Sequence, residues 1–377
     1  MAEGEKTEKE WMNHVLELRD KNPILSTEYR LRADANKVGV ISRQGRGNIP
    51  SLYSSGRGLA EAWENAVICL WNQGGFVRTQ YDGKNEKTGL YCVGPSMDCS
   101  MNWVIEEPLS EPMIHRDFPG GLDALEEYRQ EVIDGIKDNW IRDPNNPNDE
   151  RWEYTYHERM FKYKVPGLEQ TLNQFEIMTQ NLARSPITRR AQISSWKPWE
   201  DSQISDPACF QSMWGRILRE HPEEGFEFYS DETTGKPKLN LNVRFRSWDA
   251  YGASFMNMFA FTEVGRVMAE RISEEIGEEV TLGRIDCKGD SYHIYYKDFK
   301  DFLGRFAKGL ETRHFHPEED YDTEARTWNS DSEIVKVSFE EARRQIPIKI
   351  AAQNAKYEKG EDLTKDSTTL FKDEESD

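Results

Sequence analysis

Hydrophobic positions recur at helical spacing in several segments of the chain, because residues three and four apart share one face of a helix. Ala62, Trp63, Ala66, Val67 and Leu70 form one such stripe, which ends at a Gly-Gly pair suited to a helix C-cap. Other stripes predict further helices, with a final helix pair before the C-terminal tail. The predicted helices run from Glu8 to Arg19, from Leu59 to Gly74, from Leu122 to Ile136, from Leu168 to Ala183 and from Phe255 to Glu275.

Alternation of apolar and polar residues predicts strands in other segments. The clearest case is Leu239, Leu241, Val243 and Phe245, where every second residue is apolar. Helices interleave with strands without a regular strand–helix–strand repeat, so the pattern predicts an α+β fold rather than a doubly wound sheet. The other segments of extended composition are Leu90–Trp103, Ile193–Trp196, and two short strands, Val280–Cys287 and His293–Tyr296, around Lys288–Ser291.

The acidic character of the chain narrows the classes of partner. Its 377 residues carry a formal net charge of −19, whereas a general nucleic-acid or anionic-membrane binder would present a basic surface. The longest apolar runs are too short to span a membrane, and the first residues lack the apolar core of a signal peptide. We therefore expect a cytoplasmic protein, and an anionic small substrate would need a local cluster of arginines.

Cys209 is the cysteine with the most informative surroundings. It follows Asp206-Pro207 and lies between the Arg189-Arg190 pair and Arg246. Guanidinium groups match phosphate oxygens in pairs, and nearby positive charge stabilises a thiolate, the reactive form of cysteine. The stretch therefore indicates a nucleophilic site for a phosphorylated substrate. The cysteines at positions 69, 92, 99, 209 and 287 form no Cys-x-x-Cys pair, which is typical of reduced thiols.

Longer motifs follow one another between Leu59 and Tyr296. They are Ala62-Trp63-Glu64, a glutamate in the second helix, Tyr154-Thr155-Tyr156 with Glu158-Arg159, Arg189-Arg190, Trp196-x-Pro198, Asp206-Pro207-x-Cys209, Phe245-Arg246-Ser247-Trp248-Asp249 with Tyr251-Gly252 and then Asn257, and Gly289-Asp290 before His293-x-Tyr295. Each motif is weak evidence alone, but in this order they resemble the thymidylate synthase and pyrimidine hydroxymethylase family. Their motif sequences are closest to those of archaeal members. The resemblance implies a mixed sheet with flanking helices, packed back to back with a second sheet in a homodimer.

The resemblance also implies a reaction. A cysteine thiolate, here Cys209, adds to C6 of a pyrimidine nucleoside monophosphate, and C5 then attacks the one-carbon unit of 5,10-methylene-tetrahydrofolate or a methanopterin-type analogue. The implied conversion is dUMP to dTMP, because an amide at Asn257 can pair with uracil, whereas relatives acting on cytosine tend to carry an aspartate there.

The same motifs imply roles for the other residues of the site. The implied roles are general acid/base for Glu131, a place near the C5 proton for Tyr156, contact with the pterin for Asp249, phosphate binding for Arg246, Ser247, Arg189, Arg190 and Arg78, base reading for Asn257, and sugar binding for His293 and Tyr295. In the family, the arginine pair acts across the dimer interface. No metal is implied.

Several alternatives stay open from the sequence. Water rather than a hydride could quench the methylene, which would make the chain a hydroxymethylase, and a non-catalytic nucleotide- or RNA-binding relative is a further alternative. Neither the sugar nor the carrier is defined. The residue-level alternatives are an inert buried thiol for Cys209, structural roles for Glu131 and Tyr156, an ordinary polar role for Asn257, and Arg43 or Arg46 in place of Arg78.

The resemblance also sets the predicted boundaries. We predict an N-terminal extension over 1–57, a catalytic domain over 58–316, a C-terminal helical segment over 317–358 and an acidic, disordered tail over 359–377. The sequence departs from the family at Phe210, where many bacterial relatives have histidine, and at His293, which stands one residue farther from the Gly-Asp pair. The tail also lacks the short apolar C-terminus of typical synthases.

Overall fold

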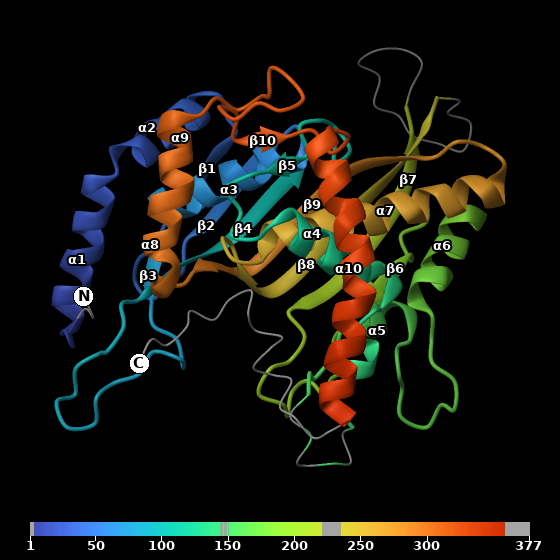
Figure 1. Cartoon of the computed structure of the whole chain (residues 1–377), viewed down its shortest axis with the longest axis horizontal. Helices are drawn as coiled ribbons and strands as arrows, with labels where there is room; N and C mark the ends of the chain where they lie inside the picture. Colours follow the sequence, from blue (N-terminus) through green and yellow to red (C-terminus); the bar gives the residue numbers. More distant parts are fainter. Residues whose placement is uncertain (1–3, 144–145, 147–148, 150, 221–234, 359–377) are drawn as a thin grey trace. The chain divides into compact units, whose positions relative to one another are not determined.

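The computed structural model describes residues 4–143, 146, 149, 151–220 and 235–358. The predicted acidic tail, 359–377, lies outside the described residues. Figure 1 labels the helices and strands of the chain. The chain divides into two compact units, and β8 (Pro237–Asp249) and β9 (Thr281–Ile294) contribute residues to both. Among the described residues, unit 1 comprises those of 4–119, Phe245–Phe255 and Asp286–Ser332, and unit 2 comprises those of 120–244, Met256–Ile285 and 333–358.

Unit 1 contains parallel and antiparallel strand pairs. The strand order is β1 (Val38–Ser42), β2 (Ser51–Gly56), β4 (Ser96–Ile105), β9 and β8, with β3 (Gly75–Val77) beside β4. The β1–β2 and β3–β4 pairs are antiparallel, whereas β2–β4 is parallel. A separate two-stranded sheet joins β5 (Ile114–His115) to β10 (Thr327–Trp328). The sheet is mixed and has flanking helices, so the predicted α+β class is confirmed.

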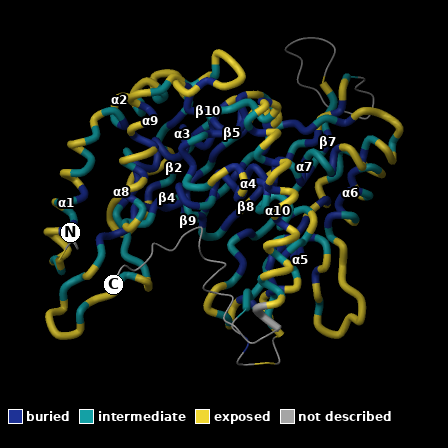
Figure 2. Tube along the Cα trace, viewed as in Figure 1, coloured by how far each residue is buried: buried dark blue, intermediate teal, exposed yellow. Residues whose placement is uncertain are grey.

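Helix α3 (Leu59–Gln73) is the most deeply buried helix of unit 1 (Figure 2). It packs on β2 and β4, and it ends as predicted at Gly74, whose N–H donates to the Leu70 carbonyl at 2.7 Å. A helix that is apolar on most sides is stable only when other elements cover it. The other helices are α1 (Glu8–Lys21), α2 (Pro23–Asp34), η2 (Tyr296–Asp298), α8 (Phe299–Asp301), η3 (Phe302–Ala307) and α9 (Lys308–Thr312).

A buried carboxylate on α3 is held by cations from outside the segment that carries the motifs. Glu64 accepts hydrogen bonds from Arg326 at 2.6 and 3.1 Å and from Arg32, and it lies 2.9 Å from the His115 ring nitrogen. Burial opposes ionisation of Glu64, but the hydrogen bond with His115 and the charges of Arg32 and Arg326 hold its pKa well below the usual range. Arg32 lies on α2 in the N-terminal extension, and Arg326 directly precedes β10.

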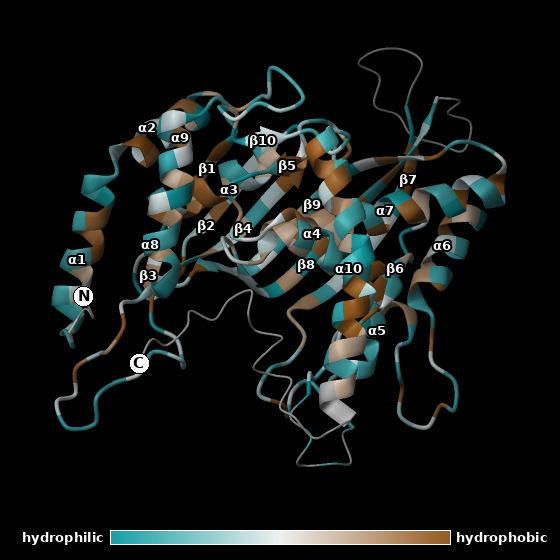
Figure 3. Cartoon of the chain, viewed as in Figure 1, coloured by the Kyte–Doolittle hydropathy of each residue, from teal (hydrophilic) through white to brown (hydrophobic). Residues whose placement is uncertain are grey.

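Unit 2 contains the strand order β9, β8, β7 (Phe210–Arg219) and β6 (Gln192–Ser194), with β6 antiparallel to β7. Helix α10 packs along α4, and Figure 3 shows apolar and polar stretches on both. The helical elements are α4 (Leu122–Asp134), η1 (Asp138–Trp140), α5 (Tyr156–Phe161), α6 (Gln174–Arg184), most of α7 (Ser254–Ile276) and α10 (Glu333–Glu358).

The helices α1, α3, α4 and α7 lie where the periodicity predicts them, but α6 begins later than predicted. Its N-cap is Asn173, whose side chain accepts a hydrogen bond from the Glu176 N–H at 3.0 Å. The segment from Leu168 to Leu172 is therefore outside the helix, and both of these leucines are exposed. A good capping residue decides the boundary here, although the apolar residues before it follow the helical spacing.

The prediction of two short strands around Lys288–Ser291 is wrong, because β9 runs through this segment without interruption. Its polar residues pair with β4 rather than forming a turn: the Lys288 ammonium donates to the Ser100 hydroxyl at 2.7 Å, and Ser291 donates to Asp98 at 2.8 Å. Gly289 lies close to Tyr292, since an added Cβ would stand 3.1 Å from the Tyr292 Cβ. A glycine in a strand often marks such a close approach.

Candidate active site

Cys209 lies directly before β7 and is partly exposed. Its backbone N–H donates to the Tyr154 hydroxyl at 3.3 Å. Tyr154 stands just before α5, whose N-cap Thr155 accepts a hydrogen bond from the Glu158 N–H at 3.0 Å. The Tyr-Thr-Tyr motif thus folds as the start of a helix, and this start places a phenol beside the cysteine. Burial raises the pKa of Tyr154, so this phenol stays neutral.

A cavity of about 240 Å³ lies within unit 2 and contains two predicted catalytic residues, Glu131 and Tyr156. Asp206, from the motif that carries the cysteine, also lines it. The Tyr156 ring packs edge-on against Phe210, with ring centroids 5.8 Å apart, so the residue that departs from the bacterial pattern supports this tyrosine. The complete lining is Tyr128, Glu131, Trp152, Glu153, Tyr154, Thr155, Tyr156 and Asp206.

Glu131 is a largely shielded carboxylate with one close cation. The Lys137 ammonium lies 3.1 Å from Glu131 and 2.9 Å from Glu127. Burial raises the pKa of Glu131, and Lys137 only partly offsets this effect. A raised pKa brings the Glu131 carboxyl closer to the range that suits general acid/base catalysis.

Asn257, on α7, is buried and donates through its amide nitrogen to the Tyr128 hydroxyl on α4. Tyr128 and Glu131 line the same cavity, and Glu131 lies three residues after Tyr128 on α4. Burial raises the pKa of Tyr128 well above its usual range. A neutral hydroxyl therefore orients the amide that the sequence assigns to base reading.

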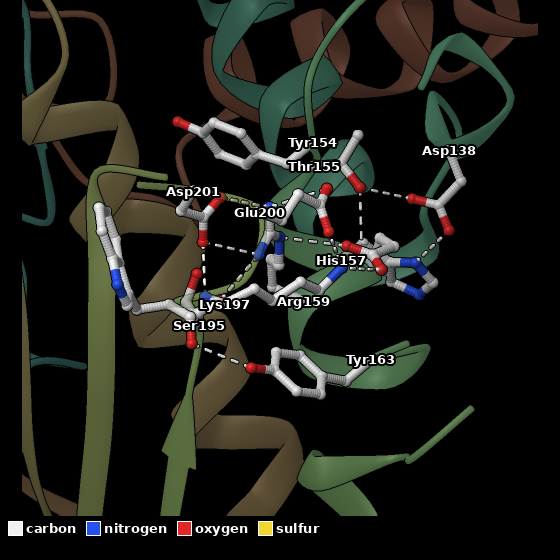
Figure 4. A network of polar contacts seen from close by, with 12 residues as sticks. Asp138, Tyr154, Thr155, His157, Arg159, Tyr163, Ser195, Lys197, Glu200 and Asp201 are labelled. Atoms are coloured by element: carbon white, nitrogen blue, oxygen red, sulfur yellow. Dashed lines mark hydrogen bonds and ion pairs between the residues drawn. The ribbon is translucent and has the colours of Figure 1, made fainter. Parts of the chain in front are cut away.

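A buried polar network joins α5 to the segment 195–201 (Figure 4). The Arg159 guanidinium donates to both carboxylate oxygens of Asp201, at 2.8 and 2.9 Å, and to the Ser195 carbonyl at 3.0 Å. Lys197 donates to Glu158 at 2.9 Å through its ammonium and to Asp201 at 2.6 Å through its backbone N–H. These bonds tie α5 to the segment 195–201, so they fix the place at which Tyr154 and Tyr156 enter the site.

The predicted sugar, phosphate and pterin residues of β8 and β9 belong to unit 1. Arg246 and Ser247 are partly exposed. His293 is buried, with Nδ1 3.2 Å from the Ser291 hydroxyl and the Tyr295 ring packed edge-on at 4.6 Å. Burial lowers the pKa of His293, which favours the neutral imidazole.

Asp249, the predicted pterin contact, is a carboxylate of unit 1. One of its oxygens, Oδ1, accepts the backbone N–H groups of Tyr251, at 3.1 Å, and Gly252, at 2.7 Å. Burial nevertheless raises the pKa of Asp249 to about 6. This carboxyl can therefore accept or donate a hydrogen bond near neutral pH.

The arginines differ in their surroundings. Arg189 and Arg190 are exposed between α6 and β6. Arg78 is instead engaged locally: it stacks 3.8 Å from the Tyr91 ring centroid, donates to the Val93 carbonyl at 2.6 Å and pairs with Glu8 of α1 at 3.3 Å. The phosphate role of Arg78 stays a prediction, as do the roles of Arg43 and Arg46, which are exposed.

Sequence reasoning missed several residues that line the cavity or hold it. Tyr128, Trp152 and Lys137 carried no motif of their own, although the aromatic character of Tyr128 and Trp152 was visible. Tyr128 precedes Glu131 by three positions, so helical spacing on α4 could have placed the two on one face. Lys137 follows the helix end, where no periodicity reveals a contact.

Comparison with known proteins supports the resemblance. The chain is 24% identical over 254 residues to a protein of Methanosarcina mazei named "Putative thymidylate synthase", covering 67% of this chain and 94% of that protein. Proteins of the same name from Methanopyrus kandleri and Methanocaldococcus jannaschii are 25% and 22% identical over 251 and 256 residues, covering 66% of this chain in both cases and 96% and 92% of those proteins. These archaeal relatives confirm the predicted resemblance to the thymidylate synthase family.

Two further comparisons add less. No family model matches the chain. The thermostable thymidylate synthase A from Bacillus subtilis aligns with a TM-score of 0.45 and 16% identity, covering 69% of this chain and 87% of that one. Within the described part of the chain, no helix is long and apolar enough to cross a membrane.

Proposed function

We propose that this chain is a thymidylate synthase-type enzyme that transfers a one-carbon unit to C5 of dUMP and gives dTMP. The observation that carries the proposal is the placement of Cys209 by the Tyr154 hydroxyl, next to residues that line a cavity with Glu131 and Tyr156. Nucleophile, acid/base carboxyl and tyrosine come from three separate motifs, and unit 2 folds them into one region. The archaeal relatives support the same assignment.

The proposed chemistry begins at the Cys209 thiolate. Its sulfur forms a bond to C6 of the uracil, and the C5–C6 π electrons move to C5 and O4 as an enolate. C5 then bonds to the one-carbon unit as one of that unit's two bonds to carrier nitrogen breaks. Loss of the C5 proton with cleavage of the second carbon–nitrogen bond leaves an exocyclic methylene on C5, and addition of a hydride from the carrier to this methylene, with expulsion of the sulfur, gives the methyl group and restores the C5–C6 double bond. Glu131, acting through water, exchanges protons at O4 and C5, and Tyr156 lies near the departing C5 proton. Asn257, oriented by Tyr128, reads the uracil edge.

The carrier is a tetrahydropterin, either 5,10-methylene-tetrahydrofolate or a methanopterin-type analogue. It supplies the one-carbon unit and, in a synthase, the hydride that converts the methylene to a methyl group. Asp249 fits the nitrogen-rich edge of such a ring, because its pKa of about 6 lets the carboxyl accept or donate hydrogen bonds.

The phosphate and sugar groups complete the proposal. Arg246 and Ser247 bind the 5′-phosphate, and His293 with Tyr295 holds the sugar hydroxyl. The exposed Arg189 and Arg190 act on the phosphate of the partner subunit in a cytoplasmic homodimer, whose sheets pack back to back. Arg78, with the locally paired guanidinium, remains the least supported member of the phosphate set.

The test is incubation of the purified protein with dUMP tritiated at C5 and 5,10-methylene-tetrahydrofolate, followed by product mass. We expect tritium release and a methyl product. Cys209→Ser should abolish release while dUMP binding persists, and Cys92→Ser, which changes an exposed cysteine, should leave the rate unchanged.

Three other outcomes have distinct meanings. A hydroxymethyl product would move the assignment to a hydroxymethylase. Release only with a methanopterin-type carrier would redefine the co-substrate. Nucleotide binding without release under any condition, unaffected by Cys209→Ser, would identify a non-catalytic nucleotide-binding relative.

A further inference from the structure

The C-terminal helix α10 lies beyond the last motif of the resemblance, yet it contacts the helix that carries Glu131. α10 packs along α4. Arg343 of α10 donates to Glu126 of α4 at 2.8 Å, and Lys349 donates to Glu127 at 3.0 Å. Both contacts join a segment that lies beyond the last motif to the predicted catalytic helix.

Glu127 connects Lys349 to the active site through a second lysine. One oxygen of Glu127 accepts from Lys349 at 3.0 Å, and the other lies 2.9 Å from the Lys137 ammonium. The same ammonium lies 3.1 Å from Glu131. The four groups therefore alternate in sign in the order Lys349, Glu127, Lys137, Glu131, and they run from the surface of α10 to the wall of the cavity.

The inner three of these charged side chains are shielded from solvent. The side chains of Lys137, Glu127 and Glu131 are 10%, 15% and 14% exposed, whereas Lys349 is 56% exposed. Trp140 and Trp152 both lie 5.3 Å from the Lys137 ammonium. Opposite charges at such distances interact much more strongly in a partly buried site than in water.

Other charged groups near Glu131 are negative or are paired elsewhere. Asp138 of η1 also acts on Glu131, but it is held by His157 at 2.7 Å and by Lys162 at 3.0 Å. Glu153 and Asp206 line the cavity as further carboxylates. Lys137 is thus the cation within salt-bridge distance of Glu131 among the described residues.

We propose that Lys137 is a positioning residue that favours the ionised form of Glu131 and holds its carboxylate at the cavity wall, and that α10 regulates this effect through the Lys349–Glu127 contact. The inference rests on the proposed function, in which Glu131 exchanges protons with the substrate. Lys137 itself touches no reacting atom. The Lys137 ammonium interacts with both Glu127 and Glu131. A contact that holds Glu127, such as that of Lys349, therefore also changes the strength of the interaction between Lys137 and Glu131.

The experiment follows the ionisation of Glu131 directly and through turnover. The Glu carboxyl carbons are labelled with ¹³C, Glu131 is assigned by the missing signal in Glu131→Gln, and its shift is titrated in the wild type and in Lys137→Met. The same variants give pH profiles of tritium release. We expect Lys137→Met to raise the Glu131 titration midpoint by at least one pH unit and to lower the rate at pH 7 at least about tenfold, because one opposite charge has been removed.

Three variants make the result specific. Lys137→Arg keeps the charge and should restore most of the wild-type profile. Lys349→Met should move the midpoint in the same direction by a smaller amount, whereas Lys336→Met, an exposed lysine of the same helix, should have no effect. An unchanged Glu131 midpoint in folded Lys137→Met would overturn the proposal, and equal effects of Lys349→Met and Lys336→Met would overturn the role of α10.

The two readouts also separate this inference from the proposed function. If the wild type releases no tritium, the proposed function fails, while the carbon titration still reports whether Lys137 controls the ionisation of Glu131. If release occurs but neither readout responds to Lys137→Met, only the inference fails.

Discussion

The Tyr154 hydroxyl accepts the backbone N–H of Cys209 at 3.3 Å, which joins the nucleophile segment to the start of α5. The two residues are far apart in the sequence, and their contact holds the backbone of Cys209 beside Tyr154, which lines the cavity. Because the bond involves the backbone of Cys209, it constrains where the sulfur can point without using the sulfur itself.

Replacing Tyr154 with phenylalanine removes this hydroxyl while keeping the ring. We expect kcat to fall about tenfold, the equivalent of one hydrogen bond, with a small change in KM for dUMP. Tyr163→Phe is the matched control, because that hydroxyl donates to the Trp196 carbonyl at 3.0 Å in the supporting network. Equal losses in both variants would show that the Tyr154 bond contributes only to folding.

The contact between Tyr128 and Asn257 predicts an effect on base selection. Tyr128→Phe removes the hydroxyl that accepts from the Asn257 amide nitrogen, so the orientation of the amide donor and acceptor toward uracil is less tightly defined. We expect the ratio of kcat/KM for dUMP to that for dCMP to fall roughly tenfold, as for loss of one directional contact. Steady-state assays with both nucleotides measure the ratio, and an unchanged ratio would contradict the role of Tyr128.

The Arg159–Asp201 pair predicts a large effect on stability. Arg159→Met leaves the Asp201 carboxylate buried without its bidentate partner, which should lower the free energy of unfolding by about 3 to 5 kcal/mol. Urea denaturation gives the value. Arg344→Met, which removes an exposed pair, should change it by less than about 0.5 kcal/mol. A loss below about 1 kcal/mol for Arg159→Met would show that the network reorganises.

Asp249 predicts a pH dependence of stability. Its pKa is raised to about 6 in the folded chain, so the folded state binds this proton more tightly than the unfolded state does. The stabilising contribution is therefore present below about pH 4 and is lost as the pH rises through about 6. The loss is about 2 to 3 kcal/mol.

The isosteric variant Asp249→Asn isolates that contribution. An asparagine oxygen can still accept the two backbone N–H groups, because both bond to the same oxygen of Asp249. Urea unfolding of both proteins between pH 4 and 8 should give curves that diverge above pH 5, with the variant more stable. Parallel curves would show that Asp249 does not titrate in this range.

Periodicity predicted the elements with strong, regular patterns and missed those decided by contacts. The stripe on α3 and the alternation in β8 are local properties, so both elements were predicted. The continuity of β9 depends instead on Lys288 and Ser291 meeting β4, a relationship that the segment alone does not contain. Strand β7 was missed because its apolar positions are interrupted by Gln211, Ser212 and Arg216.

The site shows the same division. Motif order singled out Cys209, Glu131 and Tyr156, and two of these share a cavity in the structure. Lys137 could not be found this way, since its relation to Glu131 arises only where the chain leaves α4 and turns back. Sequence motifs indicate the groups that take part in the chemistry. The charged residues that shift the pKa values of those groups can lie outside the motifs, because only the fold brings them close.

The contacts of Glu64 with Arg32 and Arg326 set a condition on any fragment of this protein that is made to fold by itself. A fragment cut to the span of the motifs, from Leu59 to Tyr296, would lose Arg32 and Arg326 and keep the buried Glu64 carboxylate with His115. Such an uncompensated charge costs several kcal/mol, comparable to the whole stability of a domain. A fragment that is meant to fold by itself must therefore include Arg32 and Arg326 as well as the segment that carries the motifs.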